Sequence, residues 1–419
     1  MSSKQGSSLR FSFIMITSLF FMWGFVHNLD PILIPHLKKS FSLSVLQSSL
    51  VDSAVFIAYF LMALPAGFLM RKYGYKNAII VGLILFATGS FLFIPAANTQ
   101  QYFFFLGALF IIACGLTILE TAANPYASLL GPPESATQRL NFAQSFNGLA
   151  ATLAPIIGAR IILTQGYSDI ELNAMADGAK ELALASEASS VKMPYFMLGS
   201  IIVCIAVIFY FLKLPSIHEV ENKHTSKVSD AWRHPILRWA VIAQFFYVGA
   251  QVCVFSFFIL YASKAAGIDK VKAADYLGWG CGMAFMFGRF AGTYIMKYIR
   301  PERLLAAYAA INILLCVVAI TTSGMITVYT VIVIAFFMSI MFPTIFSMGI
   351  KNLGIDTEMG SSLIIMSIVG GALLPLVFGY ISDVTGNIQM GYAVPLISFI
   401  VILLFAKKVA PTSKTNLHV

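Results

Sequence analysis

Charged residues are scarce in this chain of 419 residues. Asp, Glu, Lys and Arg make up 11% of the residues, whereas ordinary soluble domains carry about 25%. Hydrophobic residues make up 59%, and the mean hydropathy is +0.84. This composition argues against a surface covered by water, because too few polar groups are available to cover it. We therefore predict an all-α membrane protein, in which each spanning helix satisfies its own backbone groups.

Several chemical signatures are also lacking. The five cysteines stand singly in apolar runs, with no Cys-x-x-Cys pair and no His at ligand spacing, so we expect no disulfide and no metal site. There is no glycine-rich phosphate loop, which argues against nucleotide-driven pumping and a bound cofactor. No nucleophile and base stand at a recognisable spacing, so we expect no enzyme activity. The net charge of +9 is spread over short links, which argues against nucleic acid as a partner.

Long apolar runs are abundant. About 20 apolar residues span a bilayer, and by this rule the chain contains twelve runs separated by polar or Gly- and Pro-containing links. Lys and Arg concentrate in the links on the side that holds both termini, so we expect both termini to be cytoplasmic. Lys4 and Arg10 precede the first run, but no cleavage pattern follows it, and we expect that run to be retained. The runs are 11–35, 46–70, 76–96, 101–130, 140–165, 193–214, 235–262, 272–297, 302–322, 325–349, 358–382 and 389–407.

Internal repeats divide the chain into halves. Residues 66–73 resemble residues 291–298, and a Pro- and Gly-containing segment at 154–158 resembles residues 374–379. We predict an N-terminal six-helix bundle (1–214), a cytoplasmic linker (215–234) and a C-terminal six-helix bundle (235–419). Parallel repeats of this kind are typical of transporters that hold substrate between the halves near the membrane midplane. The link at 166–192 has high helix propensity, so we expect a short surface helix there.

One carboxylate stands inside an apolar run. Glu120 shares a helical face with Thr117 and Asn124, at spacings of three and four residues. A carboxylate at mid-membrane costs about 2.5–3.5 kcal/mol on insertion scales and usually faces a cavity or a partner. We expect this face to line a transport cavity and Glu120 to bind the coupling proton. Alternatively, Glu120 is a structural acid bonded to a neighbouring helix, and Asn124, which precedes Pro125, satisfies backbone groups freed by that proline.

A second acid lies in the first run. Asp30 precedes Pro31, and proline disfavours helical geometry at the residue before it, so a kinked helix is expected. Interrupted helices at membrane depth are typical of binding sites; alternatively, Asp30 lies at the outer interface and is hydrated. With Asp30 and Glu120 as the two acids placed at mid-depth, a proton is favoured as the coupling ion over sodium, which would need several fixed oxygen ligands.

Amides and aromatic residues supply candidate substrate contacts. Asn141, Gln144 and Asn147 recur every three residues, and their donors and acceptors suit sugar hydroxyls; they could equally join helices. The next candidates lie in the second half, where aromatic rings suit the apolar face of a sugar, although the 36 phenylalanines make packing the alternative. They are Gln244, Tyr247, Gln251 and Trp279, with Arg289 as a gating or helix-capping cation.

The motifs Leu119-Glu-Thr-Ala-Ala-Asn-Pro125 and Arg139-Leu-Asn-Phe-Ala-Gln-Ser-Phe-Asn147 closely resemble those of bacterial sugar:proton symporters of the L-fucose permease type, within the major facilitator superfamily. The resemblance covers nearly the whole chain. It implies the major facilitator fold, a place in the bacterial inner membrane, Glu120 as one of two central carboxylates, and sugar contacts from Asn28, Gln144 and Asn147. In one departure, Pro31 occupies the other carboxylate position, and Asp30 stands one residue early, about 100° away around a helix.

From these observations we predict proton-coupled import of a monosaccharide by alternating access, with L-fucose as the first choice. Glucose, galactose or an amino sugar is the alternative substrate, sodium is the alternative coupling ion, and a membrane sugar receptor is the non-transporting alternative. We expect the lipid bilayer as surroundings, no cofactor, and function as a monomer.

Overall fold

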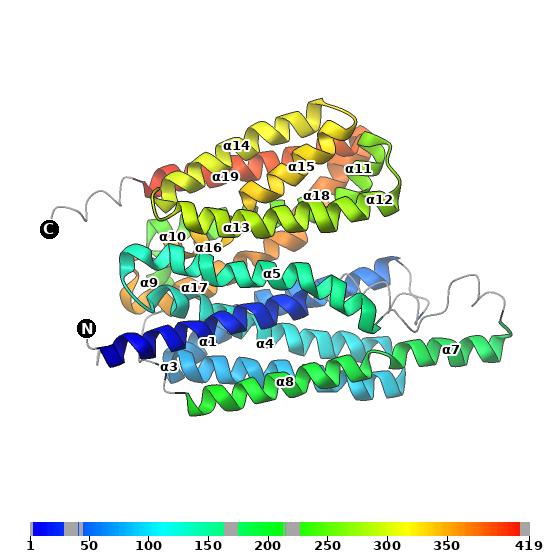
Figure 1. Ribbon diagram of the computed structural model, residues 1–419, viewed down its shortest axis with the longest axis horizontal. Helices are drawn as coiled ribbons and strands as arrows, with labels where there is room; N and C mark the ends of the chain where they lie inside the picture. Colours follow the sequence, from blue (N-terminus) through cyan, green and yellow to red (C-terminus); the bar gives the residue numbers. More distant parts are fainter. Residues whose placement is uncertain are drawn as a thin grey trace. The chain divides into compact units, whose positions relative to one another are not determined.

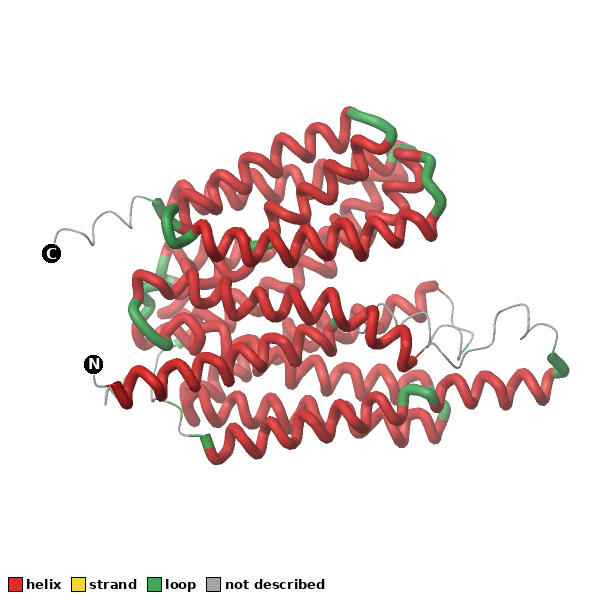
Figure 2. The backbone as a smooth tube through the Cα atoms, viewed as in Figure 1, coloured by secondary structure: helices red, strands yellow, loops and turns green. Residues whose placement is uncertain are grey.

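The computed structural model describes residues 3–28, 41, 45–162, 175–212, 214 and 227–410. Over these residues the chain consists of helices joined by turns and short loops, without a strand (Figure 2). The helices of the first half are α1 (Ser3–His27), α3 (Val45–Thr99), α4 (Tyr102–Leu129), η1 (Pro133–Ser135), α5 (Ala136–Ile162), α7 (Asp177–Ser189) and α8 (Lys192–Phe211).

The second half continues with shorter helical pieces. They are α9 (Val228–Trp232), α10 (Pro235–Ser256), α11 (Phe258–Ala266), α12 (Lys270–Asp275), η2 (Tyr276–Gly282), α13 (Met283–Ile295), α14 (Pro301–Thr321), α15 (Met325–Met338), α16 (Met341–Ile350), η3 (Gly354–Asp356), α17 (Thr357–Met366), η4 (Ser367–Val369), α18 (Gly370–Thr385), η5 (Ile388–Tyr392) and α19 (Ala393–Val409).

Each of the twelve apolar runs predicted from the sequence overlaps one or more of these helices. Within the described residues, eight helical segments are long and apolar enough to cross a membrane, and a shorter apolar helix covers Phe11–Val26. The short helix expected within 166–192 is present as α7. The expected linker at 215–234 is described only from residue 227 onward, where α9 forms.

Two predicted spans, 46–70 and 76–96, form the single helical element α3. The element is broken at Gly74, whose backbone angles are φ 79° and ψ 166°. Glycine reaches this region because it has no Cβ, whereas other residues there are strained. A one-residue break therefore replaces the loop that separates most of the other spans.

The described chain divides into two compact units, one formed by residues 1–21, 123–152 and 215–419 and the other by residues 22–122 and 153–214. Their membership differs from the division by sequence, because segments 1–21 and 123–152 of the first half group with residues 215–419. The N-terminal and C-terminal six-helix bundles stay a prediction.

In the unit of residues 22–122 and 153–214, glycines bring α3 and α4 close together. A Cβ placed on Gly115 would lie 2.6 Å from the backbone nitrogen of Phe86, and one on Gly89 would lie 2.6 Å from that of Ile112. Helix α8 lies along α3 (Figure 1), where Tyr195 stacks on Phe93 with ring centroids 3.7 Å apart. The close approach of α3 and α4 is typical of membrane proteins, in which small residues let helix backbones come together.

In the other unit, α10 contacts α16, α18 and α19, and α14 lies beside α19 (Figure 1). Four of the spans predicted for the second half are interrupted rather than continuous. The interruptions lie between α10 and α11, at the π-helix η2, between α15 and α16, and at η4. Carbonyl groups near such interruptions lose their regular helical partners and become available to side chains.

Candidate functional site

One face of α5 is lined with polar and small residues. Thr137, Asn141, Gln144, Gly148 and Thr152 recur every three or four residues and so lie above one another on the helix. This face contacts α13 and α16 within one compact unit. The side-chain oxygens of Thr137 and Ser347 lie 2.9 Å apart, Asn141 Nδ2 donates to Thr344 Oγ1 at 3.1 Å, and Thr152 Oγ1 lies 3.9 Å from the sulfur of Met286.

Arg289 joins the same face from α13. Its Nη1 donates to the main-chain oxygen of Gln144 at 2.6 Å and lies 3.5 Å from that residue's Oε1, and its Nε donates to the main-chain oxygen of Ser339 at 2.9 Å. The guanidinium lies over the ring of Phe285, 4.6 Å from its centroid, and the residue is 4% exposed. We call these α5 residues and their partners on α13 and α16 the α5 seam.

Ser339 is the C-cap residue of α15, so Arg289 caps a helix end, as one of the two sequence interpretations predicted. A cation at a helix C-terminus is favoured by the exposed carbonyl groups there. The gating role of Arg289 stays a prediction. The hydrogen bond from Arg289 to α5 is the contact through which such a role would act.

Two of the three predicted amides of α5, Asn141 and Gln144, are buried and join helices. Gln144 Nε2 donates to Asn124 Oδ1 at 3.0 Å, which connects α5 to α4. Asn124 is fully buried and Gln144 is 3% exposed. Asn147, the third candidate on this face of α5, is half-buried. The structure thus shows the helix-joining alternative for Gln144, whose role in sugar binding stays a prediction.

The candidates on α10 form a buried polar centre. Gln244 and Tyr247 are both fully buried, and the Tyr247 ring meets Phe342 edge-on with centroids 6.3 Å apart. Among the described residues, neither polar atom of the Gln244 amide has a hydrogen-bond partner. The Tyr247 hydroxyl lies near Arg289 but makes no hydrogen bond of good geometry within the described chain. Gln251, two turns further along, is half-buried.

The remaining candidates are Trp279 and Asn28. Trp279 lies in the π-helix η2 and is 64% exposed, whereas Phe285, on the same predicted span, meets Phe255 with ring centroids 5.6 Å apart. Asn28 is half-buried at the end of α1, where its Nδ2 donates to the oxygen of Gly24 at 2.7 Å. Their roles as substrate contacts stay predictions.

Glu120 is half-buried in α4, four residues before Asn124. Its helix neighbour Thr117 is fully buried and donates its hydroxyl proton to the oxygen of Ala113. Asp30 and Pro31 lie outside the described residues. The predicted proton-coupling roles of Glu120 and Asp30 therefore stay predictions.

Arg139 holds the connection between α4 and α5, a role that the sequence did not predict. Its guanidinium donates to the main-chain oxygens of Ala127, Ser128 and Pro132 and to the Ser135 hydroxyl, so it closes the connection from α4 to α5. Burial lowers the pKa of Arg139, and the nearby carboxylate of Glu134 opposes that shift. A cation that follows a helix C-terminus is the signal that could have revealed this role.

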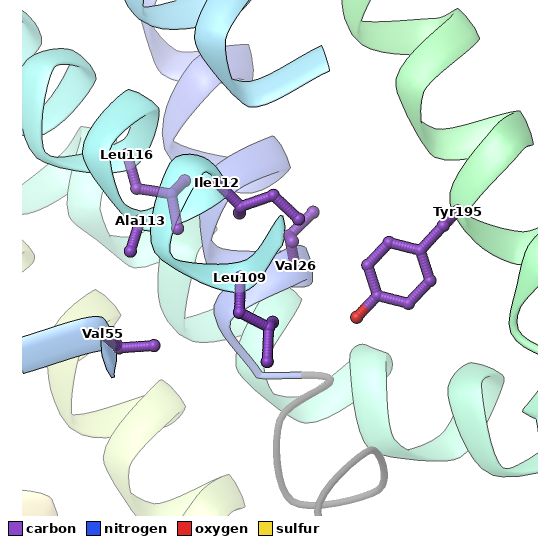
Figure 3. A pocket seen from close by; sticks show the side chains of 7 residues that line it. All are labelled: Val26, Val55, Leu109, Ile112, Ala113, Leu116 and Tyr195. Carbon is purple, nitrogen blue, oxygen red and sulfur yellow. The ribbon is translucent and has the colours of Figure 1, made fainter. Parts of the chain in front are cut away.

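A cavity in the other unit is apolar. It is lined by side chains from α1, α3, α4 and α8, and Figure 3 shows the Tyr195 ring on one side and Leu109 and Ile112 on the other. Tyr195 supplies the one side-chain oxygen in this lining, so the cavity does not have the polar walls expected for a sugar site. The full lining is Val26, Val55, Leu109, Ile112, Ala113, Leu116 and Tyr195.

Comparison with known proteins identifies the family. The sequence pattern of the Major Facilitator Superfamily matches residues 12–355. The chain belongs to the major facilitator superfamily. The sequence resemblance to the L-fucose permease type within this superfamily is also confirmed, because curated members of that type match nearly the whole chain.

Two relatives within the superfamily illustrate the similarity. The L-fucose-proton symporter of Escherichia coli (strain K12) is 40% identical over 412 residues, which cover 96% of this chain and 94% of that protein. A glucose/galactose transporter of Brucella abortus biovar 1 (strain 9-941) is 42% identical over 392 residues, which cover 93% of this chain and 92% of that protein.

Solved structures agree with this assignment. A crystal structure of the E. coli fucose:proton symporter FucP matches with a TM-score of 0.89 and 39% identity, over 96% of this chain and 99% of that one. A crystal structure of a major facilitator superfamily transporter, FucP, in the outward conformation matches equally well. The predicted fold, an all-α membrane protein of twelve helices with the major facilitator architecture, is confirmed.

Proposed function

We propose that this protein is a symporter that imports a monosaccharide together with protons by alternating access, and that it is not an enzyme. The observation that carries the proposal is the buried polar centre on α10. Burial of a polar group without a partner costs about 1–3 kcal/mol, so such groups usually serve a ligand or an ordered water. The Gln244 amide and the Tyr247 hydroxyl offer donors and acceptors that suit sugar hydroxyls.

The printed names of the relatives support a monosaccharide substrate. They describe an L-fucose-proton symporter in one case and a glucose/galactose transporter in the other, at 40% and 42% identity. These identities are too similar to separate the sugars. We keep L-fucose as the first choice and glucose or galactose as the alternative. The other proposed sugar contacts are Asn28, Asn124, Gln144, Asn147, Gln251 and Trp279.

A proton is the proposed coupling ion, and no bound cofactor is proposed. Glu120 is half-buried in an apolar helix, and acids in such positions are the usual carriers of protons in transporters. The name of the E. coli relative includes the proton, which supports the same choice. Asp30 is the second proposed proton site.

The proposed location is the bacterial inner membrane, with the protein acting as a monomer surrounded by lipid. The excess of Lys and Arg on one side supports cytoplasmic termini. In this orientation, α5 begins at the cytoplasmic side, and α13 and α16 end there, so the α5 seam extends inward from that side. Closure of the seam would then correspond to a state closed toward the cytoplasm.

The test is uptake by purified protein in proteoliposomes, with a panel of radiolabelled sugars and an imposed proton or sodium gradient. We expect L-fucose to accumulate when a proton gradient is imposed, and no accumulation with sodium alone. Accumulation of glucose or galactose instead would change the substrate. If no monosaccharide in the panel accumulates under either gradient, the proposed function is wrong.

A further inference from the structure

Glycines surround Arg289 on α5 and on its own helix. A Cβ on Gly148 of α5 would lie 3.4 Å from Cδ of Arg289, so this glycine lies directly beside the arginine side chain. On the arginine's own helix, a Cβ on Gly288 would lie 2.4 Å from the main-chain oxygen of Phe336, and one on Gly292 would lie 2.4 Å from Ile340. Helix α13 is thus held close to the end of α15, and the arginine side chain extends from it to α5.

The guanidinium binds α5 mainly through its backbone. Its short contact, 2.6 Å, is to the main-chain oxygen of Gln144, whereas the Gln144 side-chain oxygen is 3.5 Å away. The Gln144 amide nitrogen is directed to Asn124 instead. The bond from Arg289 to α5 is therefore independent of which side chain stands at position 144.

The other polar contacts from α5 to α13 and α16 are between neutral groups: Thr137 with Ser347, Asn141 with Thr344, Gln138 with the main-chain oxygen of Thr293, and Thr152 with the sulfur of Met286. A hydrogen bond from a charged donor is roughly twice as strong as one between neutral groups. Arg289 also holds two partners at once, since its Nε binds Ser339 while Nη1 binds α5. It is therefore the strongest polar tie along a seam about 22 Å long, at 1.5 Å per residue from 137 to 152.

We propose that Arg289 is a positioning residue that latches the α5 seam closed through the main-chain oxygen of Gln144, and that it must release this oxygen before the seam can open. This proposal rests on the proposed transport function, because only in a transporter is the α5 seam a barrier between the substrate and the cytoplasm. The latch is formed by backbone on α5 and by a helix end at Ser339, so it acts on the helices and not on the sugar.

The test measures how often the seam opens, without any sugar. Ser347 is 4% exposed within the seam, so a Ser347→Cys thiol is protected while the seam is closed. The background carries Cys204→Ser, since Cys204 is the one exposed native thiol. In full-length protein in proteoliposomes, we expect Arg289→Ala to raise the rate of alkylation by a water-soluble maleimide about 10-fold, as loss of a charge-assisted tie allows.

Three further variants sharpen the test. Arg289→Lys should raise the rate less, because one ammonium group cannot reproduce the two-armed contact of a guanidinium. Gln144→Ala should leave the rate unchanged, because it keeps the main-chain oxygen. Arg303→Ala is the matched control, since it removes an exposed arginine from α14. Thermal unfolding of each purified variant separates local opening from loss of the fold.

An unchanged alkylation rate in folded Arg289→Ala would overturn the proposal, and so would an equal rise in Gln144→Ala. If Arg289→Ala does not fold, Arg289→Lys alone decides, with an unchanged rate counting against the latch. The readout is independent of substrate. If no sugar is taken up but the alkylation rate of Arg289→Ala rises 10-fold, the latch is supported and the proposed function is wrong. If a sugar is taken up but the alkylation rate is unchanged, the proposed function is supported and the latch is wrong.

Discussion

The interface of α3 with α4 and the α5 seam are built from different materials. Between α3 and α4, glycines such as Gly82, Gly89 and Gly115 bring backbone against backbone. Along the α5 seam, side chains such as Asn141 and Arg289 form hydrogen bonds between helices. Each interface lies within its own compact unit.

The difference matters because separation of the helices breaks dispersion contacts at the first interface and hydrogen bonds at the second. Close backbone contact is stabilised by many short-range dispersion contacts, which vanish once a gap opens. Hydrogen-bonding side chains can exchange their partners for water at little net cost. The glycine interface is therefore suited to staying closed, and the polar seam is suited to opening and closing.

The largest effect is expected from filling the glycine interface. Gly115→Leu places carbons where the nearest backbone nitrogen, of Phe86, lies 2.6 Å from a Cβ. Overpacking of this kind destabilises by about 1–3 kcal/mol, occasionally more, and we expect a lower melting temperature and a lower yield of monodisperse protein in detergent. Gly107→Leu on the same helix is the control, because a Cβ at Gly107 meets no atom within 4 Å. Equal behaviour of the two variants would contradict the contrast.

Removal of the acid on α4 should leave the fold intact but abolish coupling. We expect Glu120→Gln to lose uphill, proton-driven uptake completely, because the amide cannot take up and release the proton, while sugar exchange across the membrane persists. The measurement is accumulation of labelled sugar in vesicles with a proton gradient, compared with counterflow in the same vesicles. Full accumulation by the variant would show that Glu120 does not carry the coupling proton.

Gln144→Ala removes the side-chain amide of one seam residue and keeps its main-chain oxygen, so the variant tests the amide alone. If the side chain also binds sugar, affinity should fall by about 1–3 kcal/mol through an unsatisfied partner, measured by a binding isotherm. Gln138→Ala is the matched control, because this amide on α5 donates to the oxygen of Thr293 and is not a proposed sugar contact. An unaltered isotherm would leave Gln144 with the helix-joining role alone.

The smallest effect is expected from a single neutral contact of the seam. Thr344→Val removes the oxygen that accepts from Asn141, but Asn141 also donates to the main-chain oxygen of Thr137. Interhelical hydrogen bonds in membranes average about 0.6 kcal/mol, so the alkylation rate of Ser347→Cys should rise only about threefold. Thr330→Val is the control, since its hydroxyl bonds within its own helix. If the alkylation rate of Thr344→Val rises as much as that expected for Arg289→Ala, the neutral contacts hold the seam closed as strongly as the arginine does.

The spans could be predicted because hydrophobic length alone fixes them, and Arg289 could be identified because a cation inside an apolar run requires a partner. The interruption near Phe257 could not, since no proline lies near it. The interruption at Ser339 did have a signal that was missed, because Pro343 stands four residues later and cannot donate to the Ser339 carbonyl. The partners Thr137 and Ser347 were missed for another reason. A lone hydroxyl in an apolar helix usually bonds to its own preceding turn, so nothing local marks it as a contact between helices.

The break at Gly74 has a consequence for protein engineering. Since the two spans of α3 meet at one residue, with helix on either side, no exposed loop tip exists there to accept an epitope or a fluorescent protein. Loop tips are the sites where insertions and proteolytic nicks are usually tolerated. A reporter inserted at Gly74 would instead have to displace a helical turn, so fusion partners belong at other connections of the chain.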